Sequence, residues 1–262
     1  MILRCQVISK DVLSILKSST LKFHSKFDKG LNLIGDGKLI FISESRVPFG
    51  MTLHLNTFKY LSFVNEQTTI TQYHRTLKLG SVIIDFSDAL VLDYRIDFGI
   101  DRKYARFLFQ FLNSKNIESG LGIALNQIQN IPEIQGFYHG DYHNGVHYLC
   151  GRGKGLTPSG DDILLGILAT MQLFNQVDLD YLTSLNTIRH KQTTAISTSY
   201  LHYAKQQKYT FVLREFLTSI EAASPALLTS HFNRILQYGH TSGIDTMAGI
   251  LVGARIIIGE NK

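Results

Sequence analysis

The spacing of apolar residues changes near residue 100, and this change limits the folds open to the chain. Before it, short segments alternate apolar and polar residues, as half-buried strands do. After it, apolar residues recur at helical spacing, first at Tyr104, Phe107, Leu108 and Phe111. Strands followed by helices predict an α+β fold. We expect a strand-rich region over residues 1–100 and a mainly helical region over 101–262, as two domains or as one integrated domain.

Turn residues define the expected strands more closely. Gly35-Asp36-Gly37 separates two apolar runs within residues 31–42 and predicts a hairpin. A strand is expected over 51–55, and a second hairpin over 82–94 around Ser87-Asp88-Ala89. Later helices are expected at about 119–129, 160–175, 178–207 (with a break allowed), 209–220, 225–238 and 243–258. Ser224-Pro225 is typical of a helix start, a capping residue followed by proline.

Composition narrows the classes of function. The chain has 262 residues, 44% of them hydrophobic and 18% charged, which predicts a globular protein with a substantial core. The net charge of +5 comes from scattered Lys and Arg residues, so we expect a small anionic substrate and no nucleic acid. Two cysteines cannot build a disulfide framework. The start lacks a signal-peptide pattern and no window holds 18 consecutive apolar residues, so we expect a cytoplasmic protein without a membrane span.

The strongest functional signal is the segment Gly-Arg-Gly-Lys-Gly-Leu-Thr-Pro-Ser-Gly-Asp-Asp at residues 151–162. Its glycines let backbone N–H groups approach an anion closely, and an apolar helix is expected to follow at once. We therefore predict substrate binding by the loop residues Gly151, Arg152, Gly153 and Gly155. The candidate catalytic residues are the hydroxyls and carboxylates of Thr157, Ser159, Asp161 and Asp162.

A partial copy of this motif occurs near the C-terminus, at Ser242-Gly243-Ile244-Asp245. Each copy places Asp three residues after Ser, a spacing that simple helix capping also explains. Gly166 and Gly249 lie four residues beyond the two aspartates, where another backbone could pack closely. If the two helix starts converge, Ser242 and Asp245 join the substrate site, and Asp162 with Asp245 could bind Mg²⁺.

The glycine-rich signature resembles that of a bacterial family tagged as putative carboxylases, which includes the third subunit of oxamate carbamoyltransferase from allantoin degradation. Three further stretches agree with that family's pattern: residues 48–50, residues 193–204, and Thr241-Ser242-Gly243-x-Asp245. Lys154 departs from it, because many relatives carry an uncharged residue there. The resemblance implies carbamoyl transfer between carbamoyl phosphate and a small amide such as oxamate, in a complex with other protein subunits.

Two other functions remain open at the level of sequence. The first is a magnesium-dependent hydrolase of the ADP-ribosylglycohydrolase kind, suggested by Asp161-Asp162 and Asp245-Thr246. The second is a non-catalytic, ligand-binding subunit. His139, His143 and His147 have metal-ligand spacing, but Gly140 and Gly145 make us interpret their segment as a loop without a zinc site. Thr194 and Ser197 could face the site or bond to their own helix.

Overall fold

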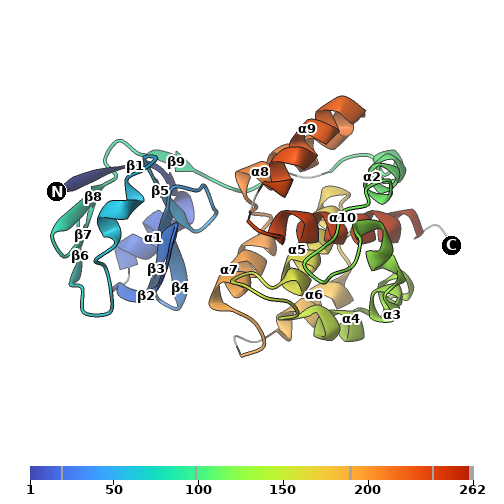
Figure 1. Cartoon of the computed structure of the whole chain (residues 1–262), viewed down its shortest axis with the longest axis horizontal. Helices are drawn as coiled ribbons and strands as arrows, with labels where there is room; N and C mark the ends of the chain where they lie inside the picture. The colour runs from blue at the N-terminus through green and yellow to red at the C-terminus, as the bar shows by residue number, and fades with distance from the viewer. Residues whose placement is uncertain (19, 98, 189–190, 238, 260–262) are drawn as a thin grey trace. The chain divides into compact units, whose positions relative to one another are not determined.

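The computed structural model of the chain describes residues 1–18, 20–97, 99–188, 191–237 and 239–259. The chain divides into two compact units. The β unit comprises Met1–Arg95 and Lys208–Phe211, and the helical unit comprises Ile96–Gln207 and Val212–Lys262. Strands dominate the first and helices the second (Figure 1), which confirms the α+β class.

The β unit is a strongly curved sheet with the strand order β2-β3-β4-β5-β1-β8-β7-β6, and β9 also pairs with β1. Its strands are β1 (Ile2–Ser9), β2 (Lys22–Phe27), β3 (Gly30–Gly35), β4 (Lys38–Ser43), β5 (Gly50–Leu53), β6 (Ile70–Tyr73), β7 (Thr76–Leu79), β8 (Val82–Asp85) and β9 (Leu90–Leu92). Helix α1 (Lys10–Ser18) and the 3₁₀ helix η1 (Phe58–Leu61) complete it. The core is formed by buried residues of these elements, among them Ile8, Val12, Leu31, Ile40 and Met51.

The first predicted hairpin is confirmed. Strands β3 and β4 pair antiparallel, with Gly35 opposite Lys38. Asp36 and Gly37, between them, both have positive φ angles, 50° and 71°. This is the backbone conformation that a tight hairpin turn requires.

The second predicted hairpin, over 82–94, is wrong. Both segments are strands, but each pairs in parallel with β1: β8 beside Ile2–Arg4 and β9 beside Val7–Ser9. Asp85 accepts hydrogen bonds from the N–H and hydroxyl of Ser87, so the chain turns within 85–87 and continues along β1. The sequence showed the alternation of apolar and polar residues in each strand, but not that both strands would pair with β1.

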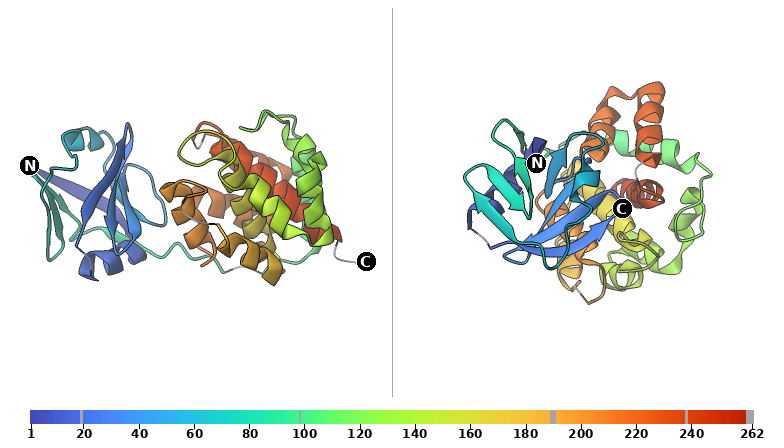
Figure 2. Two further views of the ribbon diagram at one scale, coloured as in Figure 1. Left: turned by 90° about the horizontal axis from the view of Figure 1, so that it is seen from below. Right: turned by 60° about the vertical axis from the view of Figure 1, so that its left-hand side comes forward.

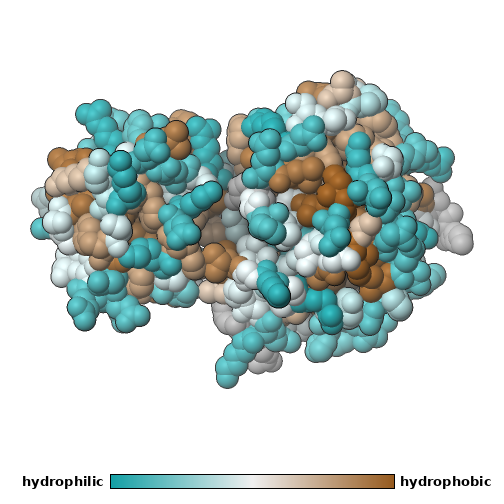
Figure 3. Space-filling model, viewed as in Figure 1, coloured by the Kyte–Doolittle hydropathy of each residue, from teal (hydrophilic) through white to brown (hydrophobic). Residues whose placement is uncertain are grey.

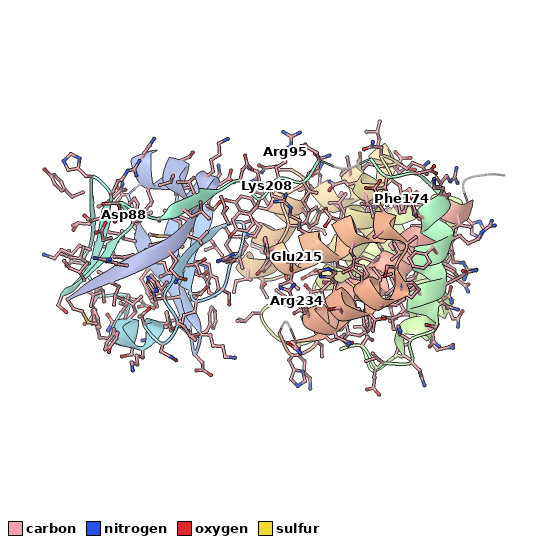
Figure 4. All side chains as sticks on the ribbon, turned by 90° about the horizontal axis from the view of Figure 1, so that it is seen from above. Asp88, Arg95, Phe174, Lys208, Glu215 and Arg234 are labelled. Atoms are coloured by element: carbon pink, nitrogen blue, oxygen red, sulfur yellow. The ribbon has the colours of Figure 1, made fainter. Side chains whose placement is uncertain are left out.

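A short return of the chain completes the β unit. Lys208 pairs antiparallel with Arg95, as Figure 4 shows, and its ammonium lies 2.7 Å from the carboxylate of Asp11. The Tyr209 N–H donates to the Tyr94 carbonyl. Because Lys208 and Asp11 are both largely shielded from water, this ion pair holds the segment more firmly than a surface pair would.

The helical unit contains α2 (Lys103–Asn113), η2 (Leu125–Asn130), α3 (Pro132–Gln135), η3 (Gly136–His139), α4 (Tyr142–Leu149), α5 (Ser159–Leu173), α6 (Leu179–Asn186), α7 (Ala195–Ala204), α8 (Phe211–Ser219), η4 (Ile220–Ala222), α9 (Pro225–Leu236) and α10 (Ser242–Gly259). Most expected helices are present, and Ser224 caps α9 with Pro225 in its first turn. On neighbouring helices, Glu215 and Arg234 form an ion pair at 2.7 Å (Figure 4).

Two local expectations in this unit are wrong. The predicted helix at 119–129 is a turn followed by η2, because the Ser119 N–H bonds to the Ile123 carbonyl and Gly122 has a φ of 73°. The segment after Gly140 is not a loop but helix α4, which contains both His143 and His147. Gly145 is tolerated within α4 because it packs against the ring of Phe137, where a Cβ would not fit.

Helices α5 and α10 run side by side in the helical unit (Figure 1), and in the right-hand view of Figure 2 other helices surround α10. A Cβ on Gly166 or on Gly249 would come within 3 Å of backbone atoms of the other helix. The prediction of close backbone packing at these glycines is therefore confirmed. By length and composition alone α10 could cross a membrane, but 78% of it is buried in the protein. Figure 3 shows apolar residues at the surface of this unit, bordered by polar ones.

Candidate functional site

The two copies of the Ser-Gly-x-Asp motif occupy equivalent positions in two helix–loop–helix units. In the first, Gly160 at the start of α5 packs against the Leu149 carbonyl at the end of α4. In the second, Gly243 at the start of α10 packs against the Ile235 carbonyl near the end of α9. A Cβ at either glycine would come within 3 Å of that carbonyl group. The partial sequence repeat therefore corresponds to a structural repeat.

The capping interpretation of the first copy is wrong. Ser159 is the first residue of α5, and Pro158 occupies the capping position without a side-chain hydrogen bond. The N–H groups of Asp161 and Asp162 donate to the Pro158 carbonyl, at 2.9 and 3.3 Å. The Ser159 hydroxyl is thus free to serve another part of the molecule, and the aspartate side chains also find partners outside their own helix.

The two helix starts converge, and each carboxylate lies beside hydroxyls of both. Asp162 of α5 is hydrogen-bonded by Ser242 of α10 and by Thr157. The hydroxyl oxygens of Thr157 and Ser242 are themselves 2.6 Å apart. The arrangement is reciprocal: the carboxylate of Asp245 on α10 lies near Ser159 of α5. The structure therefore brings together five predicted site residues from segments about 80 positions apart.

Asp245 has a further partner that the sequence did not indicate. Its Oδ1 accepts a hydrogen bond of 2.8 Å from the N–H of Gly120, in the turn before η2. Thr241, just before α10, lies on its other side. Its Oδ2 is buried and, within the described residues, has no hydrogen-bond partner, and the same is true of Asp162 Oδ2.

Asp161 faces a different direction. Its Oδ1 accepts a hydrogen bond of 2.9 Å from the N–H of Gly151, which ties the first glycine of the loop to the start of α5. Its Oδ2 accepts the hydroxyl of Thr193, and Ser197 lies nearby on α7. Thr194 caps α7 through the Ser197 N–H, so both interpretations of the pair hold: Thr194 serves its own helix and Ser197 faces Asp161. Asp161 therefore fixes the loop.

The electrostatics of the three aspartates favour their neutral forms. Burial is the main cause in each case and raises the pKa of Asp161, Asp162 and Asp245 above the ordinary value, because a charge is poorly solvated in the interior. The neighbouring Asp245 carboxylate raises the pKa of Asp162 further. Hydrogen bonds from Ser242 and Gly120 oppose the two shifts only in part. A protonated carboxyl group here would not repel an anion.

A cleft of about 650 Å³ opens beside these helix starts. It is lined by Gly120, Leu121, Ile123, Tyr148, Arg152, Gly153, Lys154, Gly155, Ser159, His240 and Thr241. Of the predicted substrate-binding residues, Arg152, Gly153 and Gly155 line it, with the candidate catalytic residue Ser159. The buried carboxylates of Asp162 and Asp245 lie behind its wall, and Gly151 borders a neighbouring cleft that shares Tyr148 and Arg152.

The backbone of the loop is shaped by its glycines. Gly151, Gly153 and Gly155 all have positive φ angles, 68°, 110° and 95°, which other residues rarely adopt. Within the part of the chain that the structure describes, the N–H groups of Gly153, Lys154 and Gly155 donate to no protein acceptor. The Arg152 guanidinium stacks over the Tyr148 ring at 3.8 Å, and its Nε donates to the Tyr148 carbonyl. The loop thus has backbone donors that no other described part of the protein uses, and its two cations, Arg152 and Lys154, line the cleft.

Sequence reasoning missed several residues of the site. Gly120, Tyr148 and His240 line the cleft, and Thr193 binds Asp161. A signal existed for Gly120, since two glycines within Ser119-Gly120-Leu121-Gly122 are unusual in a helix, but we assigned this stretch to one. Nothing in the sequence placed that turn beside Asp245.

The magnesium site predicted at Asp162 and Asp245 stays a prediction: the two carboxylates are near enough for Asp245 to raise the pKa of Asp162. No group of three or more His, Cys, Asp or Glu side chains able to hold a metal occurs among the described residues. Asp161 points to Gly151 and Thr193, away from Asp162 and Asp245, so the three carboxylates do not converge. His143 and His147 share α4 but belong to no metal-binding group of this kind either.

Fold and site together define an α+β protein whose helical unit holds a partly cationic cleft at two paired helix starts. Residues 149–254, which contain both helix starts and the glycine loop, match the family described as oxamate carbamoyltransferase subunit AllH. This match agrees with the resemblance drawn from the sequence and shows that this part of the chain is similar to that family. No solved structure matches the chain.

Proposed function

We propose that this chain is a subunit of a carbamoyltransferase and that its glycine loop binds the phosphate group of carbamoyl phosphate. The observation that carries the proposal is that Gly153, Lys154 and Gly155, whose N–H groups donate to no acceptor among the described residues, line a cleft together with Arg152 and Ser159 at the start of α5. A helix start and a glycine-rich loop together favour a phosphate ligand. Arg152 adds a charge-assisted hydrogen-bond donor.

The reaction that fits is phosphorolysis of a carbamoylated amide such as carbamoylated oxamate. A phosphate oxygen attacks the carbamoyl carbon, and the carbonyl oxygen takes up negative charge. The bond from that carbon to the amide nitrogen then breaks, the nitrogen accepts a proton, and carbamoyl phosphate and oxamate leave. Transfer from carbamoyl phosphate to the amide is the same path reversed.

Each step needs a group that this site can supply. The Ser159 hydroxyl lies on the cleft wall and is suited to stabilise the developing oxyanion. Burial raises the pKa of Asp162, which makes its carboxyl group suited to give a proton through the adjoining hydroxyls of Thr157 and Ser242 and to take it back in the reverse direction. The raised pKa values of Asp162 and Asp245 also reduce the repulsion between these carboxyl groups and a nearby phosphate dianion.

Phosphate titration by calorimetry tests the binding step. In Gly153→Ala a Cβ would come within 3 Å of the Ser159 N–H, so we expect phosphate affinity to fall at least about tenfold, or about 1.4 kcal/mol. Gly140→Ala is the matched control: Gly140 also has a positive φ, of 79°, but open space around it and no place in the cleft. Equal affinity in both variants would contradict the phosphate site.

Turnover of carbamoyl phosphate and oxamate, measured in the complex assembled with its other subunits, tests the chemistry. Asp162→Asn keeps the shape and hydrogen bonds of the side chain but cannot exchange a proton, so we expect turnover to be abolished and the fold retained. Near-normal turnover would refute the role of Asp162. Phosphate binding without turnover by the wild-type complex would instead favour the non-catalytic, ligand-binding subunit.

A further inference from the structure

Part of the cleft wall is formed by groups that stand in front of a fully buried carboxylate. Ser159, Thr241 and Gly120 are among the residues that line the cleft. Asp245 lies behind them with none of its surface exposed, so it cannot touch a ligand in this arrangement. Any effect of Asp245 on a ligand must therefore pass through these three groups.

The contacts around Asp245 meet at one place. A Cβ built on Gly120 would lie within 3 Å of three oxygens: Ser159 Oγ, Thr241 Oγ1 and Asp245 Oδ2. Both hydroxyls therefore lie around the carboxylate oxygen that has no hydrogen-bond partner among the described residues. The other oxygen, Oδ1, is fixed by the Gly120 N–H. The side chain is thus held at one end, and its other oxygen lies beside the hydroxyls of Ser159 and Thr241, which lower the pKa of the carboxyl group through hydrogen bonds.

An unpaired buried polar atom is costly, so we expect Oδ2 to share a hydrogen bond with one of these two hydroxyls. If Oδ2 carries a proton, it can donate to the oxygen of Ser159 or Thr241. That hydroxyl then has its own proton free to point into the cleft, toward an anion. Burial of Asp245 favours this neutral form.

We propose that Asp245 is a positioning residue for anion binding, orienting the hydroxyls of Ser159 and Thr241 toward the cleft from behind its wall. This inference rests on the proposed function, because it assumes an anionic ligand in the cleft. It replaces the direct substrate or metal contact that the sequence suggested for Asp245. It also assigns a role to Gly120, whose lack of a side chain leaves room for the three oxygens.

The test compares Asp245→Asn with Asp245→Ala in calorimetric titrations with inorganic phosphate. Asparagine can keep an acceptor for Gly120 and a donor for the hydroxyls, so its phosphate affinity should stay within about threefold of the wild type. Alanine has neither group, and affinity should fall about tenfold or more. Asp180→Asn, an exposed substitution in the first turn of α6, is the matched control and should bind as the wild type does.

Two more variants separate positioning from loss of structure. In Ser159→Ala/Thr241→Val, adding Asp245→Ala should cost little further affinity, because the hydroxyls that it orients are gone. Gly120→Ala, which inserts a Cβ among the three oxygens, should weaken phosphate binding even if Asp245→Ala fails to fold, whereas Gly122→Ala has open space and should not.

The outcomes are distinct. Phosphate binding by the wild type that survives both Asp245→Ala and Gly120→Ala overturns this inference and leaves the proposed function intact. A loss that is equal in Asp245→Asn and Asp245→Ala also overturns it. No phosphate binding by the wild type overturns the proposed function and this inference with it.

Discussion

Replacing Gly249 with alanine tests the crossing of α5 and α10 that brings the two helix starts together. A Cβ on Gly249 would lie well inside the 3.4 Å at which ordinary contact begins, against the Ile163 carbonyl and the Cα of Gly166. These are backbone atoms of a buried helix and cannot rotate away. The two helices would have to separate, and a gap of about 1 Å already forfeits up to half of the dispersion energy of each contact.

The expected cost follows from this geometry. Adding atoms to a core whose neighbouring side chains can move lowers the free energy of unfolding by about 1–3 kcal/mol. Because the neighbours of Gly249 are backbone atoms, we expect Gly249→Ala to lower it by about 3 kcal/mol or more. Helix propensity alone would have the opposite sign, because alanine is favoured over glycine within a helix by about 1 kcal/mol. Steric overlap and helix propensity therefore predict changes of opposite sign in the free energy of unfolding of Gly249→Ala.

Urea unfolding, followed by circular dichroism at a helical wavelength, measures this effect. We expect the Gly249→Ala midpoint to fall with an unchanged slope, which indicates lost stability without a change in the surface exposed on unfolding. Gly259→Ala, in the last position of the same helix with open space around it, should be neutral or slightly stabilising. A Gly249→Ala variant as stable as the wild type, or more stable, would refute the close crossing.

Three further predictions concern single groups. Because burial raises the pKa of Asp162, the folded protein keeps a proton that the unfolded chain releases above about pH 4. The free energy of unfolding should therefore fall with rising pH, by at most about 1.4 kcal/mol per pH unit. Asp162→Asn should flatten this fall in urea titrations between pH 4 and 8, and parallel curves would contradict it. Burial raises the pKa of the Cys5 thiol to about 12, so alkylation at pH 8, followed by mass spectrometry, should label it only after unfolding. Ser224→Ala removes the cap that accepts the Leu227 N–H and should lower the unfolding free energy by about 1 kcal/mol, whereas Ser224→Gly should cost only a few tenths.

Local sequence rules predicted the features that depend on neighbours in the chain. The turn at Asp36 and Gly37 and the cap at Ser224 follow from the conformations that these residues prefer. The close packing at Gly166 and Gly249 was also predictable, because a repeated glycine on an apolar helix face leaves room for another backbone.

Features decided by distant partners were not predictable in this way. Capping rules assign Asp162 and Asp245 to their own helix ends, but the Gly120 N–H and the Ser242 hydroxyl are available across the site and bind them instead. Similarly, β1 pairs with both β8 and β9, which removes the hairpin expected between them. A single sequence indicates which groups need partners, but the tertiary fold decides which partners they find.

A crystal structure of the chain bound to phosphate is the most direct test of the central claim that the glycine loop is an anion site. The account predicts phosphate within hydrogen-bond distance of the N–H groups of Gly153 and Gly155, with the Ser159 hydroxyl as a further donor. The contradicting result is phosphate bound elsewhere and none at this loop, in a chain whose assembled complex turns over carbamoyl phosphate.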